Sequence, residues 1–122
     1  MDPEFAGIMT TDAPVGTADV LAAYQQITER ARAHAMAVFG ATLTPYGGSG
    51  ASTPGGEAAR QYVNGWIRNS GAFDAVLDFD AVWRDPGDPT RIAAGFDFGD
   101  HLHGNDAGYR ALAGSIDLAL FG

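Results

Sequence analysis

Apolar residues recur at helical spacing in three parts of the chain, and each part begins with residues that favour a helix start. The first part follows Thr17, a good helix cap, and the second follows Thr53 and Pro54, which suit a cap and a first helical turn. In the last part the apolar positions continue to Leu120. The expected helices cover about residues 18–36, residues 54–71 and a final segment capped by Asn105 or Asp106.

Two further runs between these helices have the character of buried strands. Residues 38–44 are mostly apolar and are followed by a proline, as expected of a buried parallel strand. Residues 73–82 alternate apolar and acidic side chains, which predicts a second strand with Asp78 and Asp80 near its end. The intervening residues 46–54 are a glycine- and serine-rich loop.

The order of elements predicts an α/β fold. A long loop separates the second strand from the last helix, and its turn-favouring residues are Pro86, Pro89, Gly95 and Gly99. Strands that alternate with helices pair in parallel through right-handed crossovers, so helices should cover both faces of the sheet. Two parallel strands leave open edges, which must be covered by strands from another chain or by self-association.

Composition narrows the possible partners. The 122 residues allow a single domain, and 15 acidic against 7 basic residues give a net charge of -8. Such a surface repels phosphate groups, so nucleic acid and anionic membranes are not expected partners. The chain has no cysteine, which excludes disulfides, thiolate metal sites and a cysteine nucleophile.

The start of the chain has the composition of a translated cloning linker, because adjoining restriction sites encode Asp2-Pro3-Glu4-Phe5. We interpret residues 1–8 as a cloning-derived leader and residues 9–122 as one α/β domain. The sequence has neither a membrane-spanning apolar run nor a signal peptide, so we expect a soluble protein and assign it no compartment.

The residues before the last helix have the composition of a catalytic loop. Asp100 and His103 are three residues apart, so the carboxylate can bind one ring nitrogen and leave the other facing a nucleophile. Taken alone, such spacing also fits a solvated loop that only caps a helix.

The surrounding residues resemble the last sequence block of the SGNH, or GDSL-type, serine ester hydrolases. In that family the pattern is Asp-x-x-His-Pro, followed by Asn-x-x-Gly-Tyr at the start of the final helix; here it is Asp100 to His103, then Asn105 to Tyr109. Upstream segments are similar to the family's fourth strand, following helix, fifth strand and next loop, in residues 40–46, 57–68, 73–80 and 84–86. The resemblance covers roughly residues 17–122, the C-terminal portion of such a hydrolase.

The resemblance implies a partial flavodoxin-like parallel sheet whose N-terminal strands are missing. It makes His103 the general base and Asp100 its orienting partner, with no cofactor and no metal. The family's serine nucleophile, oxyanion glycine and asparagine belong to its first three strands, and none of them is recognisable here. Gly104 stands where the family usually has proline, which we expect to loosen the loop.

Other side chains near this edge of the sheet have less specific signals. Ser49, in the loop after the first strand, is a candidate surrogate nucleophile, although glycine- and serine-rich loops are usually only flexible. His101 is either a solvent-exposed neighbour or a substrate contact.

Three functions follow. The first is a serine ester hydrolase acting on small acyl esters, with its missing half supplied by a separate chain or absent from this sequence. The second is a truncated, catalytically inactive homologue that serves as an interaction module. The third is a self-assembling homo-oligomer in which paired strands rebuild the sheet.

Overall fold

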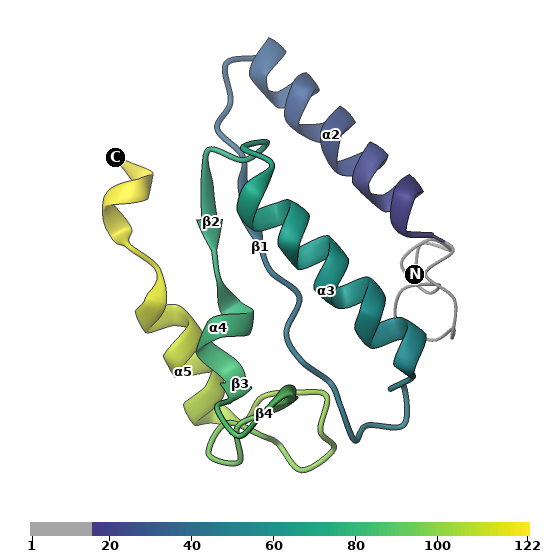
Figure 1. Ribbon diagram of the computed structural model, residues 1–122. Coiled ribbons are helices and arrows are strands. Elements are labelled where there is room, and N and C mark those ends of the chain that lie inside the picture. The colour runs from purple at the N-terminus through teal and green to yellow at the C-terminus, as the bar shows by residue number, and fades with distance from the viewer. Residues whose placement is uncertain (1–15) are drawn as a thin grey trace.

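The computed structural model describes residues 16–122, which form helices and two small sheets (Figure 1). The interpretation of residues 1–8 as a leader concerns residues outside this part. The helices are α2 (Thr17–Ala33), α3 (Pro54–Asn69), α4 (Phe79–Trp83), α5 (Asp106–Ser115) and the 3-10 helix η1 (Leu118–Phe121). The strands are β1 (Phe39–Ala41), β2 (Ala75–Leu77), β3 (Arg84–Asp85) and β4 (Asp88–Ile92).

Strands β1 and β2 form the predicted parallel pair. Phe39 lies opposite Ala75 and Ala41 opposite Leu77, and the Thr42 N–H donates to the Leu77 carbonyl at 3.1 Å. Helix α3 connects the two strands, so the predicted α/β arrangement is confirmed. Within residues 16–122 each of these strands has one neighbour.

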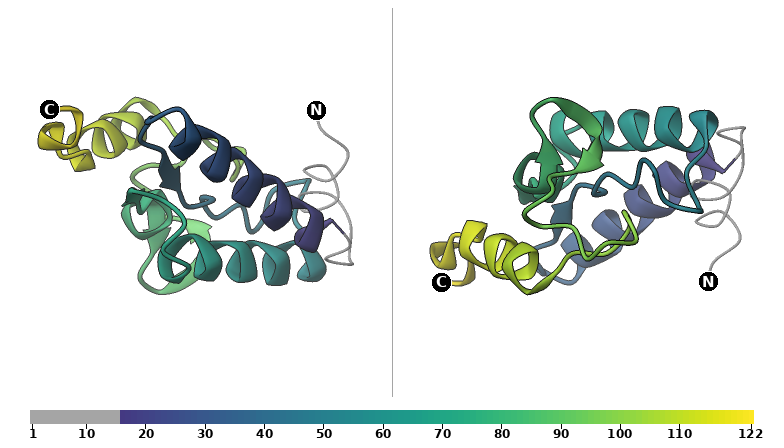
Figure 2. Two further views of the ribbon diagram at one scale, coloured as in Figure 1. Left: turned by 90° about the horizontal axis from the view of Figure 1, so that it is seen from above. Right: turned by 90° about the horizontal axis from the view of Figure 1, so that it is seen from below.

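Helices lie on both faces of this pair (Figures 1 and 2). The main core lies between α2 and α3, where Val20 packs with Ala59, Val63 and Ile67. Successive residues of a strand point to opposite faces. On β1, the α-carbon of Gly40 faces Phe73, which packs on this core, whereas the Phe39 ring contacts Phe121 of η1 at a centroid distance of 5.6 Å.

The helices start within a residue of their predicted positions, but Thr17 is not the cap of the first helix: Gly16 is the N-cap, no side chain caps α2, and Thr17 is its first residue. Two predicted helix ends are also wrong. The Thr53 hydroxyl accepts the Gly56 N–H at 2.9 Å and caps α3 as expected. Helix α2 ends at Ala33, and Ala35 adopts a left-handed conformation with φ 57°. Helix α5 ends at Ser115 because Asp117 caps the separate helix η1, where its carboxylate accepts the Ala119 N–H at 2.9 Å. No helix in residues 16–122 combines the length and the apolar character needed to cross a membrane.

The segment after β2 differs from the sequence prediction. Residues 79–83 are a helix instead of the end of a strand, because the Asp78 carboxylate accepts the Ala81 N–H and caps α4. The expected long loop contains the antiparallel hairpin β3–β4, in which Asp85 lies opposite Asp88. The turn between them is closed by the Asp85 carboxylate, which accepts the Gly87 N–H at 2.8 Å.

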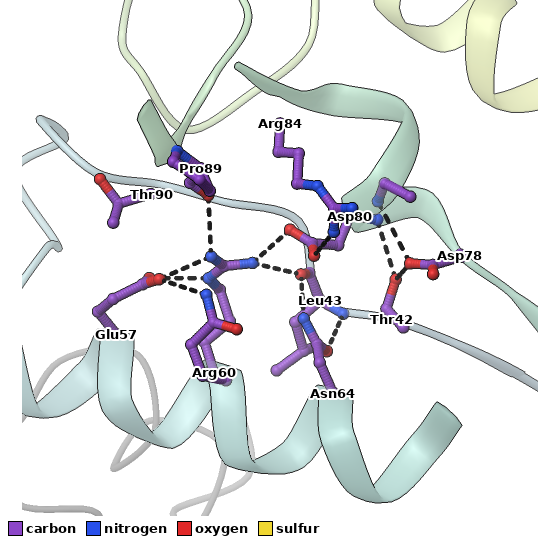
Figure 3. A network of polar contacts seen from close by, with 12 residues as sticks. Thr42, Leu43, Glu57, Arg60, Asn64, Asp78, Asp80, Arg84, Pro89 and Thr90 are labelled. Carbon is purple, nitrogen blue, oxygen red and sulfur yellow. Dashed lines mark hydrogen bonds and ion pairs between the residues drawn. The ribbon is translucent and has the colours of Figure 1, made fainter. Parts of the chain in front are cut away.

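A network of charged side chains joins α3 to the ends of both parallel strands (Figure 3). Its centre is Arg60, whose side chain is fully buried and forms ion pairs with Glu57 and Asp80. The Arg60 guanidinium also donates to the carbonyls of Leu43, after β1, and Pro89, in β4. One side chain therefore fixes four segments relative to each other.

A second arginine of α3 extends this network to the start of α4. Arg68 donates to both Asp78 carboxylate oxygens, at 2.9 and 2.8 Å, and to Asp80 at 2.7 Å. The bond from Arg68 lowers the pKa of Asp78 from 3.8 to about 2, with further help from the Thr42 hydroxyl. The carboxyl ends of the strands are thus held rigidly at the edge where the last loop lies (Figure 1).

Candidate active site

The loop before α5 folds back on itself as a short hairpin, residues 97–104, which we call the site hairpin. Asp97 and Gly104 form an antiparallel bridge, and the Phe98 N–H donates to the His103 carbonyl at 3.0 Å. The sequence indicated a plain loop here. Its backbone is instead paired at its base, so the turn at its tip is a defined structure.

The site hairpin is attached to the start of α5 through Asn105. The Asn105 side-chain oxygen accepts the Gly108 N–H at 2.8 Å, which selects Asn105 over Asp106 as the cap. Its amide nitrogen donates to the Gly95 carbonyl at 3.1 Å, and its backbone N–H donates to the Phe96 carbonyl at 2.8 Å. The first turn of α5 and the base of the hairpin are therefore one hydrogen-bonded unit.

Gly104 is held tightly, contrary to the expectation that it loosens the loop. It is buried against the indole ring of Trp83, and a Cβ atom at position 104 would overlap ring carbons of this tryptophan, one of them at 2.5 Å. The Trp83 indole N–H donates to the Gly108 carbonyl at 2.8 Å, also in the interior. Glycine is required at position 104 because the indole ring fills the space of a side chain.

Asp100 and His103 come together at the tip of the hairpin. The Asp100 Oδ2 atom lies 2.6 Å from His103 Nδ1, and its Oδ1 atom accepts the N–H groups of Leu102 at 3.0 Å and His103 at 2.9 Å. One carboxylate thus binds both the backbone and the ring of the same histidine. The ring is oriented by its neighbours and does not rotate freely.

The pair has the electrostatics of an orienting carboxylate and a base. The His103 ring, together with the two backbone N–H groups, holds the pKa of Asp100 well below its usual value. An ionised Asp100 favours the tautomer with a proton on Nδ1, which leaves the lone pair on Nε2. The His103 side chain is 62% exposed, so Nε2 is accessible to a reacting hydroxyl.

Ser49 makes no hydrogen bond to His103. Its hydroxyl oxygen is buried and finds no hydrogen-bond partner among residues 16–122. Its loop is tied to β4, where the Gly47 N–H donates to the Thr90 carbonyl at 2.7 Å. Asp100 and His103 are brought together, and the candidate nucleophile lies in a separate loop.

A second carboxylate–imidazole pair, Asp97 and His101, lies in the same hairpin. The Asp97 Oδ2 atom is 2.6 Å from His101 Nδ1. This pair was not predicted from the sequence, which indicated that His101 is an exposed neighbour or a substrate contact and gave Asp97 no role. A signal was present, because Asp97 precedes His101 by four residues, a spacing close to the three residues between Asp100 and His103.

Metal ligation has no support in the part of the chain that the structure describes. No three side chains of histidine, aspartate or glutamate are grouped there so that they could hold a metal ion. The two carboxylate–imidazole contacts of the site hairpin are suited to proton transfer by an oriented ring.

Comparison with known proteins shows the family to which the chain belongs. The model of the GDSL-like Lipase/Acylhydrolase family matches residues 6–111, which include both parallel strands and the whole site hairpin. No curated protein matches the chain. The resemblance to SGNH hydrolases is confirmed, and the chain belongs to the GDSL-like lipase/acylhydrolase family.

Proposed function

We propose that this chain is a serine ester hydrolase of the SGNH type, acting on small acyl esters, in which His103 is the general base and Asp100 orients it. The observation that carries the proposal is the 2.6 Å contact between Asp100 Oδ2 and His103 Nδ1 in a member of a lipase and acylhydrolase family. The exposed Nε2 edge of the ring then meets the substrate and the nucleophile.

In this proposal the reaction proceeds through an acyl-enzyme. As a serine hydroxyl oxygen bonds to the ester carbonyl carbon, His103 Nε2 accepts the hydroxyl proton, and Asp100 stabilises the imidazolium that forms. The ring then gives this proton to the departing alcohol, and the acyl group stays on the serine. A water molecule, deprotonated in the same way, attacks the acyl-enzyme, and the acid leaves as the serine recovers its proton.

In this proposal the sheet is completed at the outer edge of β1. A separate chain would bring the family's serine and oxyanion donors to this edge, whereas a second copy could contribute only residues that this sequence contains, such as Ser49. The Val38 carbonyl accepts the N–H of Asp74, the residue before β2, and the Thr42 N–H donates to the Leu77 carbonyl of β2. Because backbone groups alternate along a parallel strand, those of Phe39 and Ala41 point away from β2. They have no strand neighbour within residues 16–122, and such an edge can bind another strand. Ser49 is the alternative nucleophile.

The second candidate function is a catalytically inactive homologue that works as an interaction or self-assembling module. The open edge of β1 supports it, together with apolar side chains exposed beside the sheet. Val76, Leu118 and Phe121 are 37%, 78% and 64% exposed. A second copy would bury these side chains as it completes the sheet.

Turnover of a chromogenic short-chain ester tests the enzymatic proposal. We expect hydrolysis by the unmodified chain and its loss in His103→Ala. His34→Ala is the matched control, because His34 is exposed at the end of α2 and its turnover should equal that of the unmodified chain. Absence of hydrolysis, or equal rates in His103→Ala and the unmodified chain, contradicts the proposal for this chain.

Two further measurements separate the remaining alternatives. If hydrolysis occurs, an unchanged rate in Ser49→Ala removes Ser49 as nucleophile, and a rate below about one thousandth supports it. Light scattering then gives the mass in solution. A monodisperse monomer contradicts self-assembly, whereas a dimer supports a sheet completed by a second copy.

A further inference from the structure

The Asp97–His101 pair repeats the bonding pattern of the Asp100–His103 pair, with two backbone N–H groups on one carboxylate oxygen and the ring on the other. Asp97 Oδ1 accepts the N–H groups of Gly99 at 2.8 Å and of His101 at 3.1 Å, while its Oδ2 atom binds the His101 ring at 2.6 Å. The Asp97 side chain is 11% exposed, against 40% for that of Asp100. The second pair is therefore the more sheltered of the two.

His101 has an unusual backbone conformation. Its φ is 63°, in the left-handed region that residues other than glycine and asparagine rarely adopt. This residue lies between Asp100 and His103. The reversal of the chain at His101 is what brings the N–H groups of Leu102 and His103 to the carboxylate of Asp100.

Asp97 is in turn fixed to the body of the protein. Its backbone pairs with Gly104, and its carbonyl accepts the Asn105 side-chain amide at 3.4 Å. Burial by itself would raise the pKa of Asp97, but the N–H group of Gly99 and the ring and N–H group of His101 outweigh burial and lower it. An ionised, anchored carboxylate thus binds both the backbone and the ring of the left-handed residue.

We propose that His101, through its bond to Asp97, is a positioning residue that holds the turn in which His103 is aimed at the nucleophile. The inference rests on the proposed role of His103 as general base. The two pairs then have different tasks. Asp100 sets the tautomer and plane of the His103 ring, and Asp97 sets the path of the backbone that carries both Asp100 and His103.

The test measures the ring state of His103 without any substrate. In the unmodified chain, long-range proton–nitrogen NMR at a pH where the ring is neutral should show the tautomer protonated on Nδ1. His101→Ala removes the ring that binds Asp97 and leaves the left-handed turn without this anchor, so we expect a mixture of both tautomers. His101→Asn should keep most of the single tautomer, because asparagine tolerates this conformation and its amide can donate to Asp97.

Kinetics gives the second readout where the ester is hydrolysed. We expect kcat to fall about tenfold or more in His101→Ala while KM changes less than about twofold, because a misaimed base affects the reaction more than binding. Asp97→Asn should act in the same direction, and it serves as the second variant if His101→Ala does not fold. His34→Ala is again the control and should change neither readout.

The outcomes separate this inference from the proposed function. A His101→Ala chain that folds and keeps a single Nδ1 tautomer overturns the positioning role, whatever the activity is. An unmodified chain without turnover contradicts the proposed function, and in that case a tautomer change in His101→Ala still supports the positioning of the ring.

Discussion

Replacement of Gly104 by alanine tests whether the site hairpin depends on the indole ring of Trp83. The backbone of Gly104 is not in the left-handed region, so alanine meets no conformational barrier there. Its Cβ atom, however, would overlap the Trp83 ring, with one ring carbon at 2.5 Å. Trp83 is 3% exposed and therefore has little room to move.

The expected cost follows from the two ways in which the overlap can be relieved. A shift of the backbone at position 104 strains the packed interface and costs about 1 to 3 kcal/mol. Displacement of Trp83 instead breaks the bond from its indole N–H to the buried Gly108 carbonyl, which also costs about 1 to 3 kcal/mol. Because the two routes are alternatives, the cheaper one sets the cost, and we expect Gly104→Ala to destabilise the fold by about 1 to 3 kcal/mol.

Urea unfolding followed by circular dichroism measures this cost, and the chain offers a matched control. Gly114 lies in α5 with no atom within 4 Å of a Cβ built on it, so Gly114→Ala should stabilise the fold by up to about 1 kcal/mol. The same substitution should thus have opposite signs at two glycines only ten residues apart.

A double mutant identifies the cause of the effect. In a Trp83→Leu background the ring carbons that collide with Cβ are gone, so the cost of Gly104→Ala should fall by about 1 to 2 kcal/mol. Wild-type stability of Gly104→Ala, or an equal cost in both backgrounds, would refute the reasoning.

Three other perturbations test the charged groups. Arg60→Met should lower the free energy of unfolding by about 3 kcal/mol, because it leaves Asp80 buried with fewer partners. Arg91→Met, which removes a half-exposed ion pair with Asp88, should lower it by less than about 1 kcal/mol. Urea unfolding of the two variants makes the comparison. The pKa of Asp78 is lowered to about 2, so its ionised form stabilises the fold above about pH 4 and this contribution disappears as the pH falls through 2. Asp78→Asn should therefore destabilise the fold by about 1 kcal/mol at pH 6, after allowance for exposure, and the gap from wild type should close near pH 2; an equal gap at both pH values contradicts the pairing with Arg68. His103→Ala should raise the pKa of Asp100 toward its usual value, measured by carbon NMR of the carboxyl group, and an unchanged pKa would mean that the ring does not bind it.

Local sequence signals were sufficient to predict helix α3, where a capping residue directly precedes a stripe of apolar residues. Thr53 and Pro54 predicted the start of α3, and the spacing of three to four residues between apolar positions predicted its inner face. The parallel pairing of β1 and β2 also followed from the order of elements. These features depend on residues close in sequence or on a general rule of chain connection, so they can be derived without a structure.

The residues after β2 show where two local signals competed. Residues 73–82 have a strand-like alternation, but Asp78 is also a good helix cap, and the bonds from Arg68 and Thr42 fix its carboxylate where it caps α4. The choice between strand and helix was therefore made by residues ten or more positions away. Sequence periodicity alone could not decide it.

The candidate site likewise has contacts that the local sequence predicts and contacts that depend on distant residues. The contact between Asp100 and His103 was predictable because it spans three residues and matches a family pattern. The support from Trp83 was not, because it brings a ring from position 83 to a backbone at position 104. Arg60 gave a partial signal, since it lies in the buried stripe of α3, where a charge needs partners.

The buried guanidinium of Arg60 also has a consequence for how the chain unfolds. It binds a carboxylate of its own helix, the carbonyl that follows β1, the start of α4 and the backbone of β4. If one of these segments opens, its bond to the Arg60 guanidinium breaks and the buried side chain is exposed to solvent, which weakens the bonds to the other segments. Helix α3, both parallel strands and the β3–β4 hairpin should therefore exchange their amide hydrogens as one cooperative unit, while the exposed end of the chain at η1 opens independently.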